Sequence, residues 1–418
     1  MKKPEILAPA GNLKKIKYAL AYGADAVYCG LPDFSLRARV NDFNYENLNE
    51  AIHYVHGKSK KIYVTINVFA HNYHLAKLPE HLHKLKKNPP DAIIISDPGI
   101  LQMVKKELPR VKIFLSTQAN CTNWQAVKFW RKQGVSRIIL ARELTLSEIK
   151  EIHRRIPKME LECFVHGAMC MAYSGRCILS KYFTGRSANL GDCTHPCRWQ
   201  YNVLVEEKQR PKNFLPVYED ESGTYIFNSK DLCLIKYLDE LKKAGICSFK
   251  IEGRSKSIFY VASAVKAYRL AVDKKENPNQ LFKELLKLPN RGYTTGFIFG
   301  KEKCDLPAQA GQKTDSAHSS SDYEFVGEVI DCIETIHELS LPKTNEPYAL
   351  EVLVHNSLKK NDVVEIIQPK GKTIKIKIQK MIDKKTKREI KEAHGGRGQI
   401  VFIPTNIKIQ DMAILRKK

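Results

Sequence analysis

The sequence predicts an α/β fold: a (β/α)8, TIM-like barrel with a cysteine-rich insertion and an appended small antiparallel β-barrel domain. Two observations predict the barrel. Short apolar, β-branched runs alternate with helical patterns through the first part of the chain, and there are eight such runs. Runs of this kind are typical of parallel strands buried on both faces, and eight strand–helix units close a barrel. A third observation, the change to short strands separated by turns near the C-terminus, predicts the appended domain.

The expected barrel strands are Ile6–Ala8, Ala26–Cys29, Ile62–Ile66, Ala92–Ile95, Ile113–Ser116, Arg137–Leu140, Leu161–Val165 and Ser248–Ile251. A doubly wound open sheet is the alternative, but no dinucleotide-binding glycine motif follows the first run. We therefore expect the barrel at residues 1–303. The connection between the last two runs is far longer than a normal loop, so we expect an insertion at residues 167–247.

The C-terminal part of the chain has its own pattern. Residues 304–322 are rich in Ser, Ala, Gly and Gln and read as a linker. Residues 323–418 are expected to form the β domain, with strands at Phe325–Ile330, Tyr348–Val354, Asp362–Ile367, Thr373–Ile378, Gln399–Phe402 and Ala413–Leu415. From Glu351 to Lys418, 17 Lys and Arg stand against 7 Asp and Glu. This composition predicts a surface that contacts phosphates.

The charge of the whole chain points to the same class of partner. The 418 residues carry a formal net charge of +24. Such a balance favours a polyanion, above all nucleic acid, although a solvated basic surface without a partner is the alternative. Pro4, Glu5 and Pro9 interrupt the N-terminal apolar stretch, and no run of 18 apolar residues follows. We therefore expect a cytoplasmic protein without a membrane segment.

Polar residues follow several of the expected strands. Because the carboxyl ends of parallel barrel strands meet at one mouth, we expect these side chains to lie together there, although each could instead cap a helix or a turn. The set is Asn67, His71, Asp97, Gln118, Asn120, Arg142, Glu143, His166, Glu252 and Arg254. Our candidates for catalysis are His166, Glu252, Arg254 and Asn67.

Cysteines are concentrated in the insertion. Cys170, Cys177, Cys193 and Cys197 have the spacing C-x6-C-x15-C-x3-C, and four cysteines are the usual ligands of a [4Fe–4S] cluster. Zinc and unrelated buried thiols are the alternatives, and Cys233 is a spare fourth ligand. A Cys–His peptidase pair of Cys170 and His166 also stays open. The other cysteines are expected to be small core residues: Cys29, Cys121, Cys163, Cys247, Cys304 and Cys332.

The segment Glu162–Ser180 resembles the signature of the collagenase-like peptidase U-32 family. It matches the pattern Glu-x-Phe-x-x-Gly-[Ser/Ala]-hydrophobic-Cys followed by Gly-x-Cys-x-hydrophobic-Ser. The resemblance spans nearly the whole chain and is greatest to the branch that hydroxylates tRNA. Further blocks that carry it are Leu7–Asn12, Gly23–Tyr28, Ser96–Gly99, Cys193–Trp199, Asn228–Leu232, Lys250–Arg254 and Arg291–Gly296.

The resemblance implies O2-independent, prephenate-linked formation of 5-hydroxyuridine at the wobble position of the tRNA anticodon loop. It implies a [4Fe–4S] cluster on Cys170, Cys177, Cys193 and Cys197, with Cys233 as the alternative fourth ligand, and it admits a protein partner of the same family. Prephenate is a dicarboxylate, so arginines are the expected clamps: Arg37, Arg39, Arg142 and Arg254. The competing functions are a Cys- or metal-dependent collagenase-like peptidase and a non-catalytic RNA-binding or assembly factor.

Overall fold

The computed structural model describes residues 3–36, 42–170, 172–173, 176–199, 204–206, 214–216, 230–300, 321–334 and 346–418. Cys304, Arg37 and Arg39 lie outside these ranges, and so does the expected linker except for its last two residues. No helix in the described ranges is long and apolar enough to cross a lipid bilayer.

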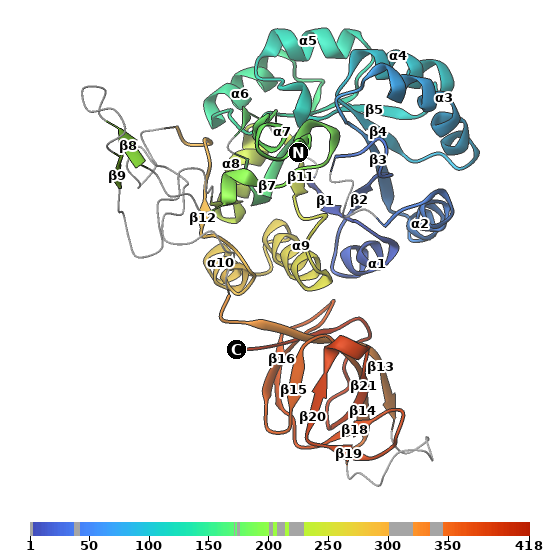
Figure 1. The fold of residues 1–418 in the computed structure, drawn as a ribbon, viewed down its shortest axis with the longest axis vertical. Coiled ribbons are helices and arrows are strands. Elements are labelled where there is room, and N and C mark those ends of the chain that lie inside the picture. The colour runs from blue at the N-terminus through green and yellow to red at the C-terminus, as the bar shows by residue number, and fades with distance from the viewer. Residues whose placement is uncertain are drawn as a thin grey trace.

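Eight parallel strands close into a barrel, as the sequence predicts (Figure 1). The sheet runs in the order β11-β1-β2-β3-β4-β5-β6-β7, and a further pairing of β11 with β7 closes it. All eight expected runs are strands in the structure. They are β1 (Glu5–Pro9), β2 (Ala26–Cys29), β3 (Lys61–Ile66), β4 (Ala92–Ile95), β5 (Lys112–Leu115), β6 (Arg137–Ile139), β7 (Glu160–Ala168) and β11 (Ile246–Ile251).

Strand β4 illustrates why these runs are apolar throughout rather than alternating. Ile93 and Ile95 face outward into the main core beneath the helices. Ala92 and Ile94 face inward and fill the barrel with a separate cluster of side chains. Both faces of the strand are therefore buried, as expected for a parallel barrel.

Helices cover the outside of the barrel (Figure 1). Several of them begin after a residue whose side chain accepts a backbone N–H of the first turn, namely Asn12, Asp97, Asn123, Thr145 and Ser257. The helices are α1 (Leu13–Ala21), α2 (Tyr45–Gly57), α3 (Asn72–Lys87), α4 (Pro98–Glu107), α5 (Trp124–Lys132), α6 (Leu146–Arg155), α8 (Leu238–Lys243), α9 (Ile258–Val272) and α10 (Pro278–Leu286).

The insertion between β7 and β11 begins at the mouth of the barrel. It contains the short helix α7 (Leu179–Thr184), the strand pair β8 (Leu204–Glu206) and β9 (Phe214–Pro216), and β10 (Asp231–Cys233). Strand β10 pairs antiparallel to the end of β7 and parallel to β12 (Tyr293–Thr294), so it extends the barrel sheet at one point. Neither β10 nor β12 was expected from the sequence, because each has only two or three residues.

The C-terminal part forms a curved antiparallel sheet in the order β17-β16-β22-β13-β14-β21-β18-β19, which confirms the predicted β domain. A short pair, β15 with β20, completes it. The strands are β13 (Glu324–Glu334), β14 (Tyr348–Val354), β15 (Ser357–Lys359), β16 (Val363–Ile367), β17 (Ile374–Lys377), β18 (Met381–Asp383), β19 (Glu389–Ile390), β20 (Glu392–His394), β21 (Ile400–Thr405) and β22 (Ile414–Lys417).

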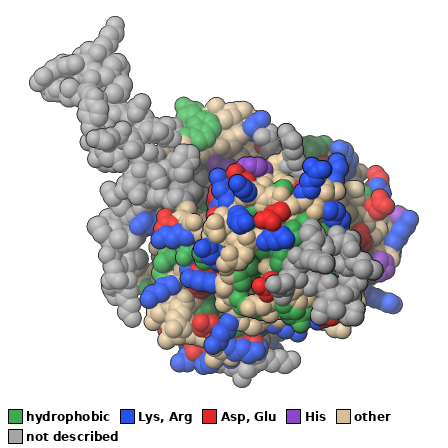
Figure 2. All heavy atoms as spheres, turned by 90° about the horizontal axis from the view of Figure 1, so that it is seen from below, with side chains coloured by type: hydrophobic (Ala, Val, Ile, Leu, Met, Phe, Trp, Pro, Cys, Tyr) green, Lys and Arg blue, Asp and Glu red, His purple; other side chains and the backbone are tan. Residues whose placement is uncertain are grey.

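The β domain packs against α1, α9 and α10 (Figure 1). Tyr18 Oη donates to Glu328 Oε2 at 2.6 Å, and Tyr22 Oη donates to the carbonyl of Ile367 at 2.7 Å. The rings of Phe259 and Phe325 stack at 5.7 Å between centroids. The contact therefore combines stacked aromatic rings with buried hydrogen bonds. Figure 2, which views the molecule from the β-domain end, shows Lys and Arg side chains spread over this face with Asp and Glu between them.

Candidate functional site

A cavity of about 90 Å³ lies at the carboxyl ends of the barrel strands, where the βα loops of such barrels carry their active sites. It combines three cationic side chains, one acidic side chain and one thiol with hydroxyl, amide and apolar groups. Its lining is Tyr28, Leu36, Thr65, Asn67, Ile94, Ser116, Thr117, Gln118, Ile139, Arg142, Phe164, Cys170, Lys250, Glu252 and Arg254. The structure therefore brings together five of the ten polar residues that the sequence places at strand ends, namely Asn67, Gln118, Arg142, Glu252 and Arg254.

Lys250 forms part of the cavity wall near the barrel axis. Its ammonium donates to Glu162 Oε1 at 3.0 Å and lies 4.2 Å from the centre of the Tyr28 ring. Burial lowers the pKa of Lys250, and the negative charge of Glu162 opposes this shift. Glu162 is fully buried, which alone would raise its pKa, but Lys250 and Arg137 outweigh burial and hold that pKa below its ordinary value. The pair therefore presents a desolvated cation to the cavity.

Arg254 is held from behind by the loop that follows β2. Its guanidinium donates to Ser35 Oγ at 2.6 Å and to the carbonyl of Leu36 at 2.5 Å. It also lies 3.3 Å from Thr65 Oγ1. Asn67 supports the same loop, since its Oδ1 accepts from the backbone N–H of Leu36 at 3.3 Å. These contacts fix the orientation of the guanidinium at the cavity wall.

Arg142 follows β6 and lies against the neighbouring strand β7. Its guanidinium carbon lies 4.0 Å from the centre of the Phe164 ring, and Nη1 donates to the carbonyl of Ala168 at 3.1 Å. Among the described residues, its buried Nε has no hydrogen-bond partner, and the same is true of Gln118 Oε1 and Asn120 Oδ1. Buried polar atoms are normally satisfied, so unsatisfied ones beside a cavity indicate a ligand site.

Glu252 lines the cavity, and its backbone lies very close to the backbone of Gly167. The N–H of Glu252 donates to the carbonyl of His166 at 2.9 Å. Gly167 has φ of +107°, and a Cβ at this position would lie 2.6 Å from the Glu252 carbonyl oxygen. This close approach and the positive φ require glycine at position 167, which accounts for the Gly that follows His166 in the sequence.

His166 does not line the cavity, which corrects its interpretation as a catalytic candidate. The register of β7 against β11 shifts between the pairs Phe164–Lys250 and His166–Ile251. Lys250 faces inward and Ile251 outward, so the irregularity turns His166 to the outer face. Its ring is fully buried beside three tyrosine rings, and burial lowers its pKa to about 3. Neither ring nitrogen has a hydrogen-bond partner in the part of the chain that the structure describes. It is a neutral core histidine.

Cys170, Cys177, Cys193 and Cys197 form no disulfide within the described residues, and each is partly exposed. They belong to residues 170–199, which lie over the mouth and which we call the cysteine segment. Cys170 lines the cavity. The N–H of Cys177 donates to Asn189 Oδ1 at 3.1 Å, and Cys193 Sγ lies 3.6 Å from His195 Nδ1. Within the described ranges, no group of three or more His, Cys, Asp or Glu side chains is close enough to hold a metal ion. As placed here, the four thiols therefore do not fit a cluster without rearrangement.

Cys233 differs from those four thiols. It is buried in the main core, with Sγ 3.8 Å from Tyr268 Oη, and burial raises its pKa to about 11. Metal ligation needs the thiolate, so this environment suits a core thiol better than a fourth ligand. Of the residues expected in the core, Cys29, Cys121 and Cys163 are buried, whereas Cys247 and Cys332 are partly exposed.

Sequence reasoning missed Lys250 as a site residue, although it lies in the quoted block Lys250–Arg254. It also missed the supporting hydroxyls of Ser35, Thr65 and Ser116. A signal for Lys250 was present: a lysine inside an otherwise buried parallel strand needs a partner, and Glu162 is the matching acid in a neighbouring strand. No comparable signal marks the hydroxyls.

The fold and the cavity define a TIM-like barrel protein with a cationic site at the carboxyl ends of its strands. The profile of Peptidase family U32 matches residues 11–306, and that of the Peptidase family U32 C-terminal domain matches residues 321–416. The chain belongs to peptidase family U32.

Curated relatives are similar over most of the chain. It is 40% identical to tRNA hydroxylation protein P of Escherichia coli (strain K12), over 89% of this chain and 87% of that protein. It is 39% identical to tRNA hydroxylation protein P of Haemophilus influenzae, over 99% and 96% of the two chains. It is 34% identical to the 23S rRNA 5-hydroxycytidine C2501 synthase of Escherichia coli, over 64% of this chain and 39% of that protein.

Proposed function

We propose that this protein hydroxylates RNA, and more narrowly that it converts the wobble uridine of tRNA to 5-hydroxyuridine. The observation that carries the proposal is the similarity to tRNA hydroxylation proteins over nearly the whole chain. A wobble base lies in a loop and can be unstacked at low cost, which the reaction needs if carbon 5 is to reach a cavity inside a barrel mouth. The basic β domain supports the same substrate class.

The charges of the cavity suit an anionic co-substrate. Arg142, Lys250 and Arg254 line it, against the single carboxylate of Glu252 at its wall. Carboxylates bind guanidinium and ammonium groups through charge-assisted hydrogen bonds, and desolvation strengthens these bonds. We therefore propose prephenate, a dicarboxylate, as the compound that binds beside the target base in an O2-independent reaction.

We further propose that Cys170, Cys177, Cys193 and Cys197 ligate a [4Fe–4S] cluster. The support is chemical: four cysteines without a disulfide within the described residues lie in one segment, and one of them lines the cavity. Binding would require the cysteine segment to draw these sulfurs together. The placement of His166 argues against a Cys170–His166 peptidase pair, since neither ring nitrogen contacts a thiol.

The function is tested by nucleoside analysis of tRNA from a strain that lacks the gene and its paralogues. We expect 5-hydroxyuridine and its derivatives to disappear, the wild-type gene to restore them, and Arg142→Met to restore little. Arg155→Met, which alters an exposed arginine on α6, is the matched control. Unchanged wobble nucleosides in the deletion strain would contradict the proposal.

The cluster is tested by iron analysis of protein purified without oxygen. We expect about four iron atoms per chain for one [4Fe–4S] cluster. Single Ala variants of Cys170, Cys177, Cys193 and Cys197 should each lose iron, while Cys121→Ala, at a buried core thiol, should keep it. Iron loss on Cys233→Ala together with retention in one of the four variants would reassign the fourth ligand.

A further inference from the structure

Three exposed aromatic side chains lie together on the cysteine segment, and neither the barrel nor the cavity uses them. Tyr182 is 80% exposed, Phe183 46% and Trp199 40%. The ring centroids of Tyr182 and Phe183 are 5.1 Å apart, and those of Phe183 and Trp199 are 6.0 Å apart. Single exposed apolar residues are common on protein surfaces, but a contiguous group of large rings marks an interaction site. We call these three residues the aromatic platform.

The aromatic platform is anchored. The indole Nε1 of Trp199 donates to the carbonyl of Thr194 at 3.3 Å, and the N–H of Thr194 donates to Ser180 Oγ at 3.2 Å. Ser180 is fully buried and belongs to α7, which also carries Tyr182 and Phe183. One hydrogen-bonded unit therefore holds the rings, so little conformational entropy is lost when a ligand stacks on them.

The segment that carries the platform sits on the mouth of the barrel. The carbonyl of Asn189 accepts from the N–H of Phe69, beyond the end of β3, at 3.0 Å. Arg176 Nε donates to the carbonyl of Gln118, beyond the end of β5, at 3.2 Å. Cys170, at the start of the segment, lines the cavity. The segment that carries the platform is therefore attached to the loops at the mouth, on the same side of the barrel as the cavity.

Charge identifies the occupant. Between residues 176 and 199 the chain has four cationic side chains (Arg176, Lys181, Arg186 and Arg198) and a single acidic one, Asp192. Single-stranded nucleic acid stacks its bases on aromatic rings and pairs its phosphates with cations, so a segment with exposed rings and an excess of basic residues suits it. An apolar protein partner would not call for that excess of positive charge.

We propose that Tyr182, Phe183 and Trp199 form a stacking platform for unpaired RNA bases that flank the nucleotide entering the barrel mouth. The inference rests on the proposed function for the identity of the RNA, but it adds a binding site on which that function does not depend. It assigns to the cysteine segment a recognition role separate from any metal.

Binding is measured by tryptophan fluorescence on the full-length protein. The chain has three tryptophans, and two of them, Trp124 and Trp130, lie on α5, so Trp124→Phe with Trp130→Phe leaves Trp199 as the only reporter. The probes are a short hairpin RNA with an unpaired loop of anticodon size and a blunt RNA duplex of equal length. We expect the hairpin to quench Trp199 and the duplex to leave it nearly unchanged.

Affinity is then compared among variants by fluorescence anisotropy of labelled RNA. Tyr182→Ala and Trp199→Ala should each weaken hairpin binding by roughly five- to 100-fold, because stacking on one aromatic ring has about that effect. Trp199→Phe should retain most of the affinity. Phe129→Ala, at a 52% exposed ring on α5, is the matched control and should bind as the wild type does. Thermal unfolding verifies that Tyr182→Ala, at the most exposed ring, still folds.

Three results would overturn the proposal: unchanged hairpin affinity in both alanine variants, equal losses for hairpin and duplex, or a change only in self-association. Failure of the proposed function is distinguishable, since a protein without hydroxylase activity could still show Trp199 quenching by the hairpin. Conversely, full hydroxylation by Tyr182→Ala and Trp199→Ala with wild-type RNA affinity would remove the platform and leave the function standing.

Discussion

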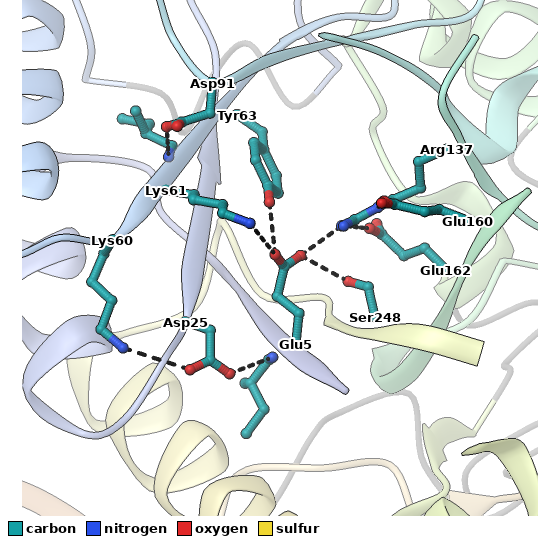
Figure 3. Close-up of polar contacts among 12 residues, drawn as sticks. Glu5, Asp25, Lys60, Lys61, Tyr63, Asp91, Arg137, Glu160, Glu162 and Ser248 are labelled. Atoms are coloured by element: carbon teal, nitrogen blue, oxygen red, sulfur yellow. Dashed lines mark hydrogen bonds and ion pairs between the residues drawn. The ribbon is translucent and has the colours of Figure 1, made fainter. Parts of the chain in front are cut away.

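The two ends of the barrel interior both contain buried charges, but they treat them differently. At the amino end, Arg137 donates to Glu5 Oε1 at 2.6 Å, to Glu160 Oε2 at 2.8 Å and to Glu162 Oε2 at 3.1 Å (Figure 3). Tyr63 and Ser248 donate to the two oxygens of Glu5. These bonds run between side chains of the protein, so this end has little hydrogen-bonding capacity left for a ligand.

At the carboxyl end Arg142 and Arg254 donate to neutral groups, whereas Lys250 donates to the Glu162 carboxylate. Arg254 donates to a serine hydroxyl and a carbonyl, and Arg142 donates to a carbonyl. Neutral oxygens support a guanidinium without cancelling its charge, so the cavity stays positive. Lys250 links the two ends because Glu162 accepts from both Lys250 and Arg137. Charges that pair with one another thus mark the amino end, where they stabilise the fold, whereas cationic side chains are in excess at the cavity of the carboxyl end.

The largest expected effect on stability is at the amino end of the barrel, where the buried charges pair with one another. Arg137→Met removes the cation that three carboxylates share and leaves buried negative charge uncompensated, which should lower the free energy of unfolding by about 3–5 kcal/mol. Denaturant unfolding at neutral pH measures it. Arg155→Met, at an exposed pair with Glu151 on α6, should change stability by less than about 0.5 kcal/mol. If Arg137→Met lowered the free energy of unfolding by less than about 1 kcal/mol, the buried ion pairs would not be what stabilises this end.

Glu328 is a second buried carboxylate with several hydrogen-bond donors, and it lies at the contact between the barrel and the β domain. Its replacement should also lower the free energy of unfolding. Glu328 accepts from Tyr18, His355 and Lys14. Burial alone would raise its pKa, but these bonds outweigh it and lower the pKa to about 2. A pKa below the unfolded value means that the stabilisation is complete above about pH 5 and is lost as the pH falls toward 2.

Glu328→Gln should therefore cost roughly 2–3 kcal/mol at pH 7, and the difference from the wild type should shrink steadily below pH 4.5. Urea unfolding at several pH values measures both curves. Glu151→Gln, at an exposed pair, is the control and should show no such convergence. Parallel curves for Glu328→Gln and the wild type would contradict the lowered pKa.

The sequence predicted the scaffold better than the site, and for a physical reason. Double burial of the barrel strands leaves a continuous apolar run such as Ala92–Ile95, which can be read locally. The orientation of His166 depends on a register shift between β7 and β11, a relation between two strands far apart in the chain. Its position at a strand end therefore predicted the mouth, whereas the structure places it in the core.

The cysteines show a different limit. Their spacing predicted a common segment at the mouth, and Cys170 does line the cavity. Spacing gives no positions for sulfur atoms, so convergence on a cluster stays a prediction. The aromatic platform escaped notice because Tyr182, Phe183 and Trp199 look like core residues in sequence, and only their exposure identifies them.

Arg142 tests the difference between the two ends of the barrel, because its replacement should reduce activity while leaving stability almost unchanged. Arg142→Met should alter the free energy of unfolding by less than about 1 kcal/mol, because only one carbonyl loses its partner. Hydroxylation of tRNA should fall by roughly 100-fold or more, as when a donor to a charged reactant is removed. Arg142→Lys keeps the charge without the planar fork and should fall between. Initial rates and unfolding curves of the same preparations decide the matter. Equal losses in both would assign Arg142 to the scaffold.

The smallest expected effect is at the surface of the β domain, where charged side chains are exposed to solvent. Lys385 is exposed and lies in the turn between β18 and β19. Lys385→Gln should leave the free energy of unfolding within about 0.5 kcal/mol of the wild type. If this turn contacts RNA phosphates, the slope of log affinity against log salt concentration should decrease by about 1, since one fewer counterion is released. Lys360→Gln is the control, because that ammonium already pairs with Glu389 at 3.1 Å. An unchanged slope in Lys385→Gln would show that this turn does not contact RNA and would leave the cationic side chains of the barrel mouth as the principal contact.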